Sequence, residues 1–529
     1  MTAPERFNAC EWLVDRHVAA GRAGCRAFVC RDRELTYGGL LEGVHVAANG
    51  LRALGCCPGD RILMVVDDEL AFPLVFLAGL RAGLVPIPVS TMLRPAEIAP
   101  LAADSGARVL VVSERYAPGV AAMVEGTGVD HAVVVDHPGG GWDPAQAPPG
   151  VPVHPMSAWV DRSETPVADT DTDSVALWLY TSGTTGRPKG AVHRHGDIRA
   201  VAETYAEHIL GVGPDDVCYS VPKLFFAFGL GNALIFPLAA GAGSVLDPDP
   251  PSPARAAALA GAHRPTLFFA PPGFCAALAD ADVPSDMLAS ARATVTAGEV
   301  LPAEVIRRFE SRFGTEMLDG IGSTEALHIF CSNRPGRARA GTSGEPVPGY
   351  QLRLLGHDGT EIADADTPGS LWVRGPSIAT GYWQRPELNE ETFVDGWLRT
   401  GDVYSRSEDG YYQFVGRNSD MIKAGGIWVS PTEVESVILE HPGVLEAAVI
   451  GARDATGLET TVAFVVPRRG GTLDVADLLA HCRARMASFK RPRQVHVVDS
   501  LPRTATGKVK RFELRASLDA PAPSATMAT

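Results

Sequence analysis

Hydroxyl, glycine and lysine residues are concentrated between positions 180 and 190. The segment reads Tyr-Thr-Ser-Gly-Thr-Thr-Gly-Arg-Pro-Lys-Gly and directly follows the apolar run Val175–Leu179. Glycines let backbone N–H groups converge on an anion, hydroxyls add donors, and Lys189 adds a full positive charge. The pattern therefore predicts a polyphosphate-binding loop, whereas a polar hairpin would explain only some of these residues. It is not a P-loop of the NTPase type, because Gly183 and Gly186 are only three residues apart and Gly190 follows the lysine.

Three further segments carry residues suited to nucleotide chemistry. Thr324 and Glu325 follow Asp319-Gly320-Ile321-Gly322-Ser323, and a hydroxyl beside a carboxylate offers the hard oxygen ligands that Mg²⁺ prefers. Taken alone, that pair is far more typical of a helix start than of a metal site. Asp402 offers two acceptor oxygens and Arg417 a fork of donors, although each by itself could be a solvated surface charge. Lys508 lies in a basic, Gly-containing segment near the C-terminus.

The order and spacing of these motifs resemble the adenylate-forming enzymes, a superfamily that includes acyl- and aryl-CoA synthetases, peptide-synthetase adenylation domains and firefly luciferase. The resemblance extends from about Leu35 to Arg515. It implies ATP, Mg²⁺ and coenzyme A as cofactors, Glu325 as the metal ligand, and Lys508, Thr324 and Glu325 as catalytic residues. The cofactor-binding residues that it implies are Thr181, Ser182, Gly183, Thr184, Thr185, Gly186, Lys189, Gly298, Glu299, Asp319, Gly320, Ile321, Asp402, Arg417, Lys423, Gly425 and Gly426.

Two segments resemble the benzoate-CoA ligase branch in particular. They are Lys223-Leu224-Phe225-Phe226-Ala227-Phe228-Gly229-Leu230-Gly231-Asn232 and Ser323-Thr324-Glu325-Ala326-Leu327-His328-Ile329-Phe330. The resemblance implies an aryl-acid pocket, since aromatic walls suit a flat ring, although some of the phenylalanines could be ordinary core residues. The implied substrate residues are Phe226, Ala227, Phe228, Gly229, Gly322, Ala326 and His328. Phe228 and Ala326 replace the usual tyrosine and methionine, which favours a larger, substituted or bicyclic ring.

One position departs from the superfamily pattern at the expected pivot between domains. The residue two after the motif arginine is commonly an aspartate in related CoA synthetases, and here it is Ser419, followed by Asp420. We expect Ser419 to be the hinge, because a small residue can absorb a large dihedral change.

Composition excludes several other functions. A chain of 529 residues is too long for a single hydrophobic core. With 46% apolar and 21% charged residues, it is also too apolar to be disordered. A net charge of -15 argues against nucleic acid and anionic membranes as partners. The nine cysteines show no metal-ligand spacing and no disulfide framework, and no secretory signal is visible, so we expect a cytoplasmic protein. Residues 224–246 carry no charge, but repeated glycines and a proline favour a loop, a short buried helix and a strand over a membrane span.

Apolar runs such as Ala293–Ala297 alternate with Ala- and Leu-rich helical stretches such as Val475–Arg485. This alternation predicts an α/β fold of stacked parallel sheets with a β-rich subdomain. We expect an N-terminal domain of residues 1–417 that binds ATP and the aryl acid, a small mobile α+β domain of residues 418–515 that carries the catalytic lysine, and a disordered tail of residues 516–529. The breaker-rich segment His137–Pro155 predicts an irregular surface connection.

The sequence favours an ATP-dependent aryl-CoA ligase that acts through an aryl-AMP intermediate, in secondary metabolism such as antibiotic biosynthesis or in aromatic catabolism. A stand-alone adenylation enzyme that loads a carrier protein is the nearest alternative. Oxidative luminescence has no separate support, and a catalytically dead nucleotide-binding protein would be expected to lose Lys508, Glu325 or Asp402, all of which are present. The oligomeric state stays open, with a homodimer as one alternative.

Overall fold

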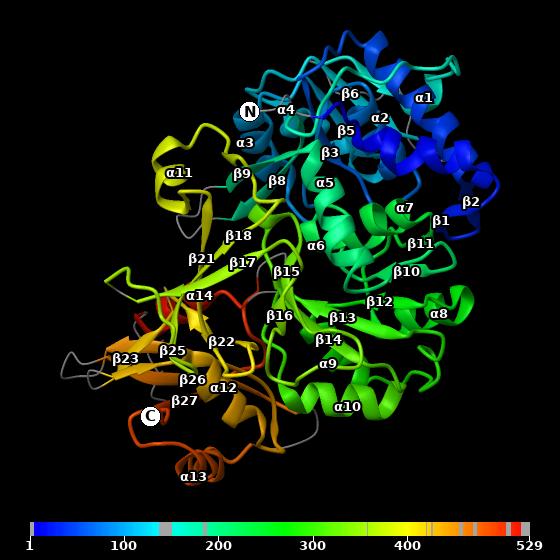
Figure 1. Cartoon of the computed structure of the whole chain (residues 1–529). Helices are drawn as coiled ribbons and strands as arrows, with labels where there is room; N and C mark the ends of the chain where they lie inside the picture. Colours follow the sequence, from blue (N-terminus) through cyan, green and yellow to red (C-terminus); the bar gives the residue numbers. More distant parts are fainter. Residues whose placement is uncertain are drawn as a thin grey trace, which may run out of the picture. The chain divides into compact units, whose positions relative to one another are not determined.

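The computed structural model describes residues 5–136, 151–182, 188–356, 358–418, 420–424, 427–453, 459–468, 473–503 and 509–519, with the backbone alone at 182, 423, 424, 427, 428 and 519. Two largely parallel sheets are formed by strands between residues 26 and 346 (Figure 1). The smaller sheet has the strand order β4-β3-β5-β6-β7, and each pair of neighbouring strands in it is parallel. Its strands are β3 (Arg61–Val65), β4 (Val85–Pro88), β5 (Val109–Ser113), β6 (His131–Val135) and β7 (Val153–Pro155). The prediction that residues up to 155 form an irregular connection is thus wrong at β7, which completes the edge of this sheet beside β6.

The larger sheet has nine strands in the order β16-β15-β14-β13-β12-β10-β11-β1-β2. The six strands from β1 to β14 are parallel to their neighbours, and antiparallel strands complete both edges. The strands are β1 (Arg26–Cys30), β2 (Arg33–Thr36), β10 (Val217–Ser220), β11 (Gly243–Leu246), β12 (Leu267–Phe269), β13 (Ala293–Ala297), β14 (Met317–Gly322), β15 (Ile329–Ser332) and β16 (Glu345–Pro346). The central strands are apolar along most of their length because helices cover both faces of a parallel sheet.

Helices connect these strands and bury their apolar faces against the sheets. They are α1 (Tyr37–Ala53), α2 (Ala71–Arg81), α3 (Pro95–Ser105), α4 (Val120–Val124), α5 (His195–Val201), α6 (Ala227–Leu230), α7 (Phe236–Ala240), α8 (Pro253–His263), α9 (Pro272–Asp280) and α10 (Ala303–Phe313). A π-helical turn, Gly231–Ile235, joins α6 to α7, so most of the uncharged stretch 224–246 is a short buried helical segment. Among the described residues, no helix combines the length and apolar character that crossing a bilayer requires.

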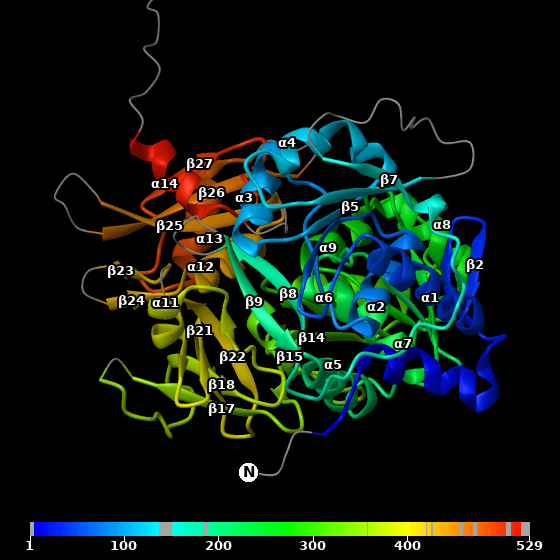
Figure 2. The ribbon, with the colours of Figure 1, turned by 90° about the horizontal axis from the view of Figure 1, so that it is seen from above.

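Antiparallel strands follow a different plan. β8 (Val175–Ser182) and β9 (Pro188–Arg194) form a hairpin that β19 (Gly381–Tyr382) extends. A separate five-stranded sheet contains β17 (Gln351–Leu355), β18 (Gly369–Arg374), β20 (Phe393–Val394), β21 (Trp397–Arg406) and β22 (Tyr412–Arg417), and helix α11 (Pro386–Thr392) lies between β19 and β20 in the chain. Figure 2 shows β8 and β9 as a long two-stranded ribbon, and both strands contact the 3-10 turn η8 (Thr324–Ala326) that follows β14.

The chain divides into two compact units. Unit 1 comprises Met1–Leu301, Val305–Leu352 and Trp372–Arg399, and unit 2 comprises Pro302–Glu304, Arg353–Leu371 and Thr400–Thr529. Beyond β22, unit 2 contains the pair β23 (Ile422–Ala424) and β24 (Ile427–Val429), a sheet of β25 (Val444–Arg453), β26 (Glu459–Pro467) and β27 (Gln494–Val497), and the helices α12 (Pro431–Leu439), α13 (Val475–Arg485) and α14 (Arg511–Asp519).

Helix α14 corrects the expected start of a disordered tail at residue 516. The helix continues to Asp519, since Leu514 is buried and Leu518 packs beside it against Ala448, Ile450 and Phe464. Two leucines four residues apart lie on one face of a helix, so burial of this stripe stabilises the last turn. Residues 520–529 lie outside the described part of the chain.

Candidate active site

The predicted polyphosphate loop joins the two strands of the β8–β9 hairpin. Residues 183–187, which include Gly183, Thr184, Thr185 and Gly186, lie outside the described residues, but both ends of the loop are placed. Thr181 pairs with Lys189, and Ser182 pairs with Pro188. Lys189 is therefore held on a regular strand directly beside the loop.

The segment after β14 places the hydroxyl and carboxylate pair next to this hairpin. Ser323 begins η8, and its Oγ accepts a hydrogen bond from Ala326 N at 3.2 Å. His193 of β9 contacts the carbonyl oxygen of Thr324 through Nε2 at 2.8 Å, and its Nδ1 lies 3.1 Å from Asp197 Oδ2. Ala379 N donates to the carbonyl oxygen of Glu325 at 2.8 Å. These contacts fix the backbone that carries Thr324 and Glu325.

Lys189 and Glu325 meet through a tyrosine that the sequence analysis did not single out. Lys189 Nζ donates to the Tyr382 hydroxyl at 2.7 Å, and that hydroxyl donates to Glu325 Oε1 at 2.6 Å. The direct separation between Nζ and Oε1 is 3.9 Å. Burial, together with the neighbouring Glu325 carboxylate, raises the pKa of Tyr382 far above its usual value, so the hydroxyl keeps its proton.

Aromatic side chains surround His328, three residues after Glu325. Its ring lies 5.5 Å from the Phe228 ring and 4.5 Å from the Phe236 ring, centroid to centroid, the latter edge to face. His328 Nε2 lies 3.1 Å from Asn232 Oδ1. Burial lowers the pKa of His328 to about 3, against an opposing effect of the Phe228 backbone, so the ring is neutral at physiological pH.

The other predicted substrate residues are divided between this cluster and the interior. Phe226, Ala227 and Phe228 are partly exposed, and Phe226 packs edge to face on the buried Phe225 at 4.5 Å. Ala326 is fully buried.

Two of the predicted glycines are explained by close packing. A Cβ at Gly229 would lie 2.0 Å from the carbonyl oxygen of Lys223, and one at Gly322 would lie 2.5 Å from that of His328. Both positions therefore exclude any side chain, whatever contact they make with a substrate.

The remaining cofactor predictions in unit 1 lie at strand ends. Asp319 of β14 is partly exposed, and its Oδ1 accepts from Thr296 Oγ1 at 3.0 Å. Enclosure raises the pKa of its carboxyl to about 8. Gly320 and Ile321 continue the same strand. Gly298 follows β13 with φ +93, and Glu299 Oε2 accepts from Gly273 N at the first turn of α9, which gives Glu299 a structural partner.

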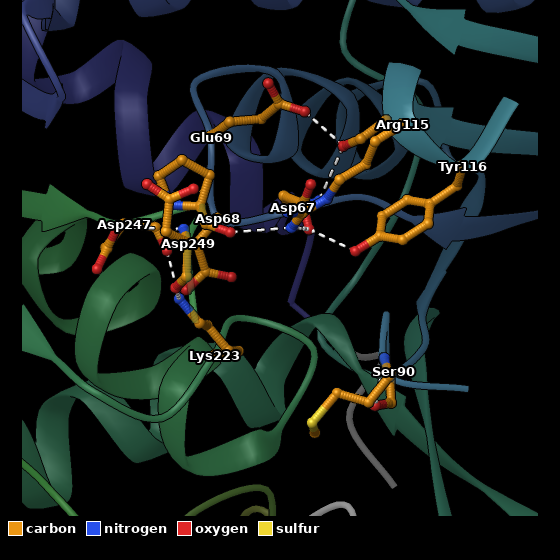
Figure 3. Close-up of polar contacts among 12 residues, drawn as sticks. Asp67, Asp68, Glu69, Ser90, Arg115, Tyr116, Lys223, Asp247 and Asp249 are labelled. Carbon is orange, nitrogen blue, oxygen red and sulfur yellow. Dashed lines mark hydrogen bonds and ion pairs between the residues drawn. The ribbon is translucent and has the colours of Figure 1, made fainter. Parts of the chain in front are cut away.

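A buried polar cluster anchors the segment before α6. Asp68 Oδ1 accepts from Leu224 N at 3.0 Å, and Lys223 Nζ donates to the carbonyl oxygen of Asp249 at 2.8 Å (Figure 3). Burial raises the pKa of Asp68 to about 7, although Lys223 opposes that rise. The cluster thus holds the start of the Phe225–Phe228 segment from behind. A cavity of about 940 Å³ opens nearby beside Asp67, Glu69 and Arg115, but none of the predicted site residues lines it.

The predicted ribose ligands belong to unit 2. Asp402 of β21 pairs in register with Arg417 of β22, and Arg417 Nε forms an ion pair with Asp402 Oδ1 at 2.8 Å. Asp402 N also donates to Thr400 Oγ1 at 3.1 Å. The backbone of Lys423 belongs to β23. Ser419, Gly425, Gly426 and Lys508 lie outside the described residues.

Three residues of the site escaped the sequence analysis. Tyr382 lies 57 residues after Glu325 in the chain. His193 and Asn232 are likewise brought to the site only by tertiary structure. Asn232 ends the segment of residues 223–232 that resembles benzoate-CoA ligases, and its place after five glycine and aromatic residues was the one signal for it. His193 and Tyr382 had none, because neither lies at a spacing typical of a site.

Two α/β sheets and a β-hairpin that holds Lys189 close to Glu325 agree with the adenylate-forming superfamily described above. The family model for AMP-binding enzymes matches residues 15–383, and that for the C-terminal domain of AMP-binding enzymes matches residues 433–508. The chain belongs to the AMP-binding enzyme family.

Several relatives within that family are named for aromatic acids. The chain is 44% identical to a benzoate-CoA ligase of Thauera aromatica, over 97% of both chains. Among solved structures, a benzoate-CoA ligase from Burkholderia xenovorans is 39% identical with a TM-score of 0.87, over 96% of this chain and all of that one. An anthranilate-CoA ligase in complex with anthranoyl-AMP is 34% identical with a TM-score of 0.91, over 98% of both.

Proposed function

We propose that this protein is an ATP-dependent aryl-CoA ligase. In the first step the aryl carboxylate displaces pyrophosphate from ATP and gives aryl-AMP. In the second step the CoA thiol attacks the aryl carbonyl, which releases AMP and a proton and gives aryl-CoA. One observation carries the proposal: Glu325, which Tyr382 links to Lys189, lies three residues before His328, and His328 packs among aromatic rings.

The residues present fit the reactants. The Glu325 carboxylate lies beside the hydroxyl-bearing Thr324, and among the described residues no cluster of three or more His, Cys, Asp or Glu side chains forms a separate metal site. This suits Mg²⁺, which usually takes one or two protein carboxylates and completes its shell with phosphate oxygens and water. Bound there, Mg²⁺ would neutralise part of the polyphosphate charge.

We assign the remaining roles on the same basis. Thr181, Ser182 and Lys189, with the loop between them, bind the phosphates. Asp319, Gly320 and Ile321, with Gly298 and Glu299, border the nucleotide, and Asp402 and Arg417 hold the ribose. Lys508 stabilises the negative charge that develops as the carboxylate attacks the α-phosphate. Lys423 contacts the nucleotide, and Gly425 and Gly426 admit the pantetheine arm.

We propose that the substrate is a benzoate-type acid with a substituent or a second ring. Phe226, Ala227, Phe228 and His328 line the ring site, while Gly229, Gly322 and Ala326 keep it open. The aromatic surroundings of His328 and its neutral state support an apolar ring site. The relative crystallised with anthranoyl-AMP, an amino-substituted adenylate, supports tolerance of a substituent.

Movement of a small domain would separate the two steps. We propose a boundary after residue 417, with Ser419 as the hinge and residues 418–515 as the mobile domain. Lys508 would be at the site during adenylation, and Gly425 and Gly426 would be there during thioester formation. A cytoplasmic location is proposed from the nine cysteines, whose spacing shows no disulfide framework and therefore suits a reducing compartment.

One experiment separates the aryl-CoA ligase from the carrier-loading alternative. Exchange of labelled pyrophosphate into ATP is measured across a panel of benzoate, 3-hydroxybenzoate, anthranilate and 1-naphthoate, with acetate as the control. Product formation with the best acid is then compared for CoA and for a phosphopantetheinylated carrier protein. We expect exchange with aryl acids only, followed by transfer to CoA. Transfer to the carrier protein alone would contradict the proposal, and absence of exchange with every aryl acid would contradict it at the first step.

A further inference from the structure

The Tyr382 hydroxyl stands between the two opposite charges of the site. It accepts from Lys189 Nζ at 2.7 Å and donates to Glu325 Oε1 at 2.6 Å, and the ammonium also lies 4.0 Å from the centroid of the Tyr382 ring. The ammonium and the carboxylate stay 3.9 Å apart, at the outer limit of an ion pair. A hydroxyl that donates to one group and accepts from the other satisfies both without letting them close on each other.

The backbone around Tyr382 fixes that hydroxyl. β19 pairs with β9, with Tyr382 opposite Ala191 and two positions from Lys189 along the neighbouring strand. Tyr382 N donates to Asn389 Oδ1 at 2.7 Å, and Asn389 Nδ2 donates back to the Tyr382 carbonyl oxygen at 3.0 Å. The ring packs edge to face on Phe393 at 5.3 Å, and only 3% of the residue is exposed. The hydroxyl is therefore positioned by strand pairing, helix α11 and ring packing together.

Lys189 and Glu325 have different tasks in the proposed reaction, which this inference takes as its basis. The ammonium has to reach the polyphosphate, and the carboxylate has to reach Mg²⁺. If the two formed a close, partly buried ion pair, binding of MgATP would first have to break it, at a cost that grows as the dielectric falls.

We propose that Tyr382 is a positioning residue that keeps Lys189 and Glu325 apart and thereby ready for MgATP. The tyrosine acts through these two side chains and touches neither the aryl acid nor the reacting atoms. Its removal should weaken MgATP binding and leave the second half-reaction unaffected, because transfer of the aryl group from aryl-AMP to CoA involves neither the pyrophosphate nor its metal ion.

The variant Tyr382→Phe tests this role, since phenylalanine keeps the ring packing and the strand pairing. ATP binding is measured by isothermal titration without an aryl acid, at several Mg²⁺ concentrations. We expect the Kd for MgATP to rise about tenfold and the half-saturating Mg²⁺ concentration to rise with it, while aryl-CoA formation from supplied aryl-AMP changes by less than twofold.

The matched control is Tyr37→Phe. Tyr37 is fully buried, and its hydroxyl donates to the carbonyl oxygen of Ala242 at 2.9 Å in another part of unit 1. Tyr37→Phe should leave the Kd for MgATP unchanged. An unchanged Kd in a folded Tyr382→Phe protein would overturn the inference, as would equal losses in both half-reactions.

Asn389→Ala supplies a second test if Tyr382→Phe is unstable. It removes the two hydrogen bonds that hold the Tyr382 backbone but retains the Tyr382 hydroxyl group. The hydroxyl is then held less firmly, so we expect a loss of MgATP affinity smaller than that of Tyr382→Phe. A folded Asn389→Ala protein with wild-type affinity would overturn the inference. Failure of the proposed function is a separate result: wild-type protein would then bind MgATP but form no aryl-AMP.

Discussion

Lys508 is proposed to act in only one of the two half-reactions. We expect Lys508→Ala to slow aryl-AMP formation much more than thioester formation, because an ammonium aimed at developing charge contributes about 3–4 kcal/mol, by analogy with an oxyanion donor. Pyrophosphate exchange reports the first step, and CoA transfer from supplied aryl-AMP reports the second. Similar losses in the two assays would remove Lys508 from the proposed role.

Ala326 is the position at which ring size should be adjustable. We expect Ala326→Met to move preference toward benzoate and away from 3-hydroxybenzoate and 1-naphthoate. The Ala326 side chain is fully buried, so the longer, flexible thioether of methionine would occupy volume beside Glu325 and close to His328. One or two methylene-sized steps discriminate by about 1–3 kcal/mol, which corresponds to roughly tenfold or more in the ratio of kcat/KM values. An unchanged ranking would mean that Ala326 faces away from the ring.

At the scale of single residues, the sequence indicated which charged residues to consider, but it did not indicate which side chain connects them. Lys189 and Glu325 stand in recognisable local patterns, and the structure brings their charged groups to 3.9 Å from each other. Tyr382, which joins them, stands between a glycine and a tryptophan in no pattern of its own. Only the pairing of β19 with β9 brings it there, and such long-range pairing leaves no local signal in the sequence.

The segment that leads into α6 shows how tightly one element is packed. A Cβ at Gly229 would lie 2.0 Å from the Lys223 carbonyl, so we expect Gly229→Ala to force a backbone shift that costs about 1–3 kcal/mol of stability and raises KM for the aryl acid. Gly261→Ala is the control, since its Cβ would meet nothing within 4 Å inside α8, and it should stabilise by up to about 1 kcal/mol. Urea unfolding and steady-state kinetics check both. Equal stability of the two variants would contradict the packing argument.

Elements with a clear periodicity of apolar residues were predicted closely from the sequence. Elements that depend on contacts with other parts of the fold were not. Ala293–Ala297 and Val475–Arg485 occur with the expected bounds, because a buried strand and a helix impose clear periods. The edge strand β7 and the last turn of α14 were missed. Each is stabilised by a neighbour in the fold. β7 forms its backbone hydrogen bonds with β6, and the last turn of α14 packs on apolar side chains of unit 2.

Two buried ionisable side chains make the stability of the whole molecule depend on pH. His195 is fully buried with Nδ1 accepting from Ala9 N at 3.1 Å, and burial lowers its pKa to about 4, although Asp171 partly opposes this. His328 behaves in the same way, with a pKa of about 3. A histidine whose pKa is depressed in the folded state binds its proton preferentially in the unfolded chain, so its stabilising effect is complete above about pH 6.5 and falls as the pH is lowered toward 4.

His195→Asn tests this dependence, because an amide can keep the contact to Ala9 N without titrating. Each such histidine contributes a slope of up to about 1.4 kcal/mol per pH unit in that window. We therefore expect unfolding of the variant by urea to depend less steeply on pH between 6.5 and 4.5 than unfolding of the wild type. Parallel pH profiles would show that His195 does not titrate on unfolding.

The position of β1 in the nine-stranded sheet has a consequence for the nascent chain. β1 pairs with β2 within a short hairpin, but its other neighbour is β11, where Phe28 lies opposite Ser244 and Cys30 opposite Leu246. The ribosome therefore has to add residues 31 to 246 before this strand can reach its permanent place, which takes roughly 10–40 s at about 5–20 residues per second. An isolated hairpin is only marginally stable in water, so the apolar Phe28 and Val29 remain open to chaperones during that interval.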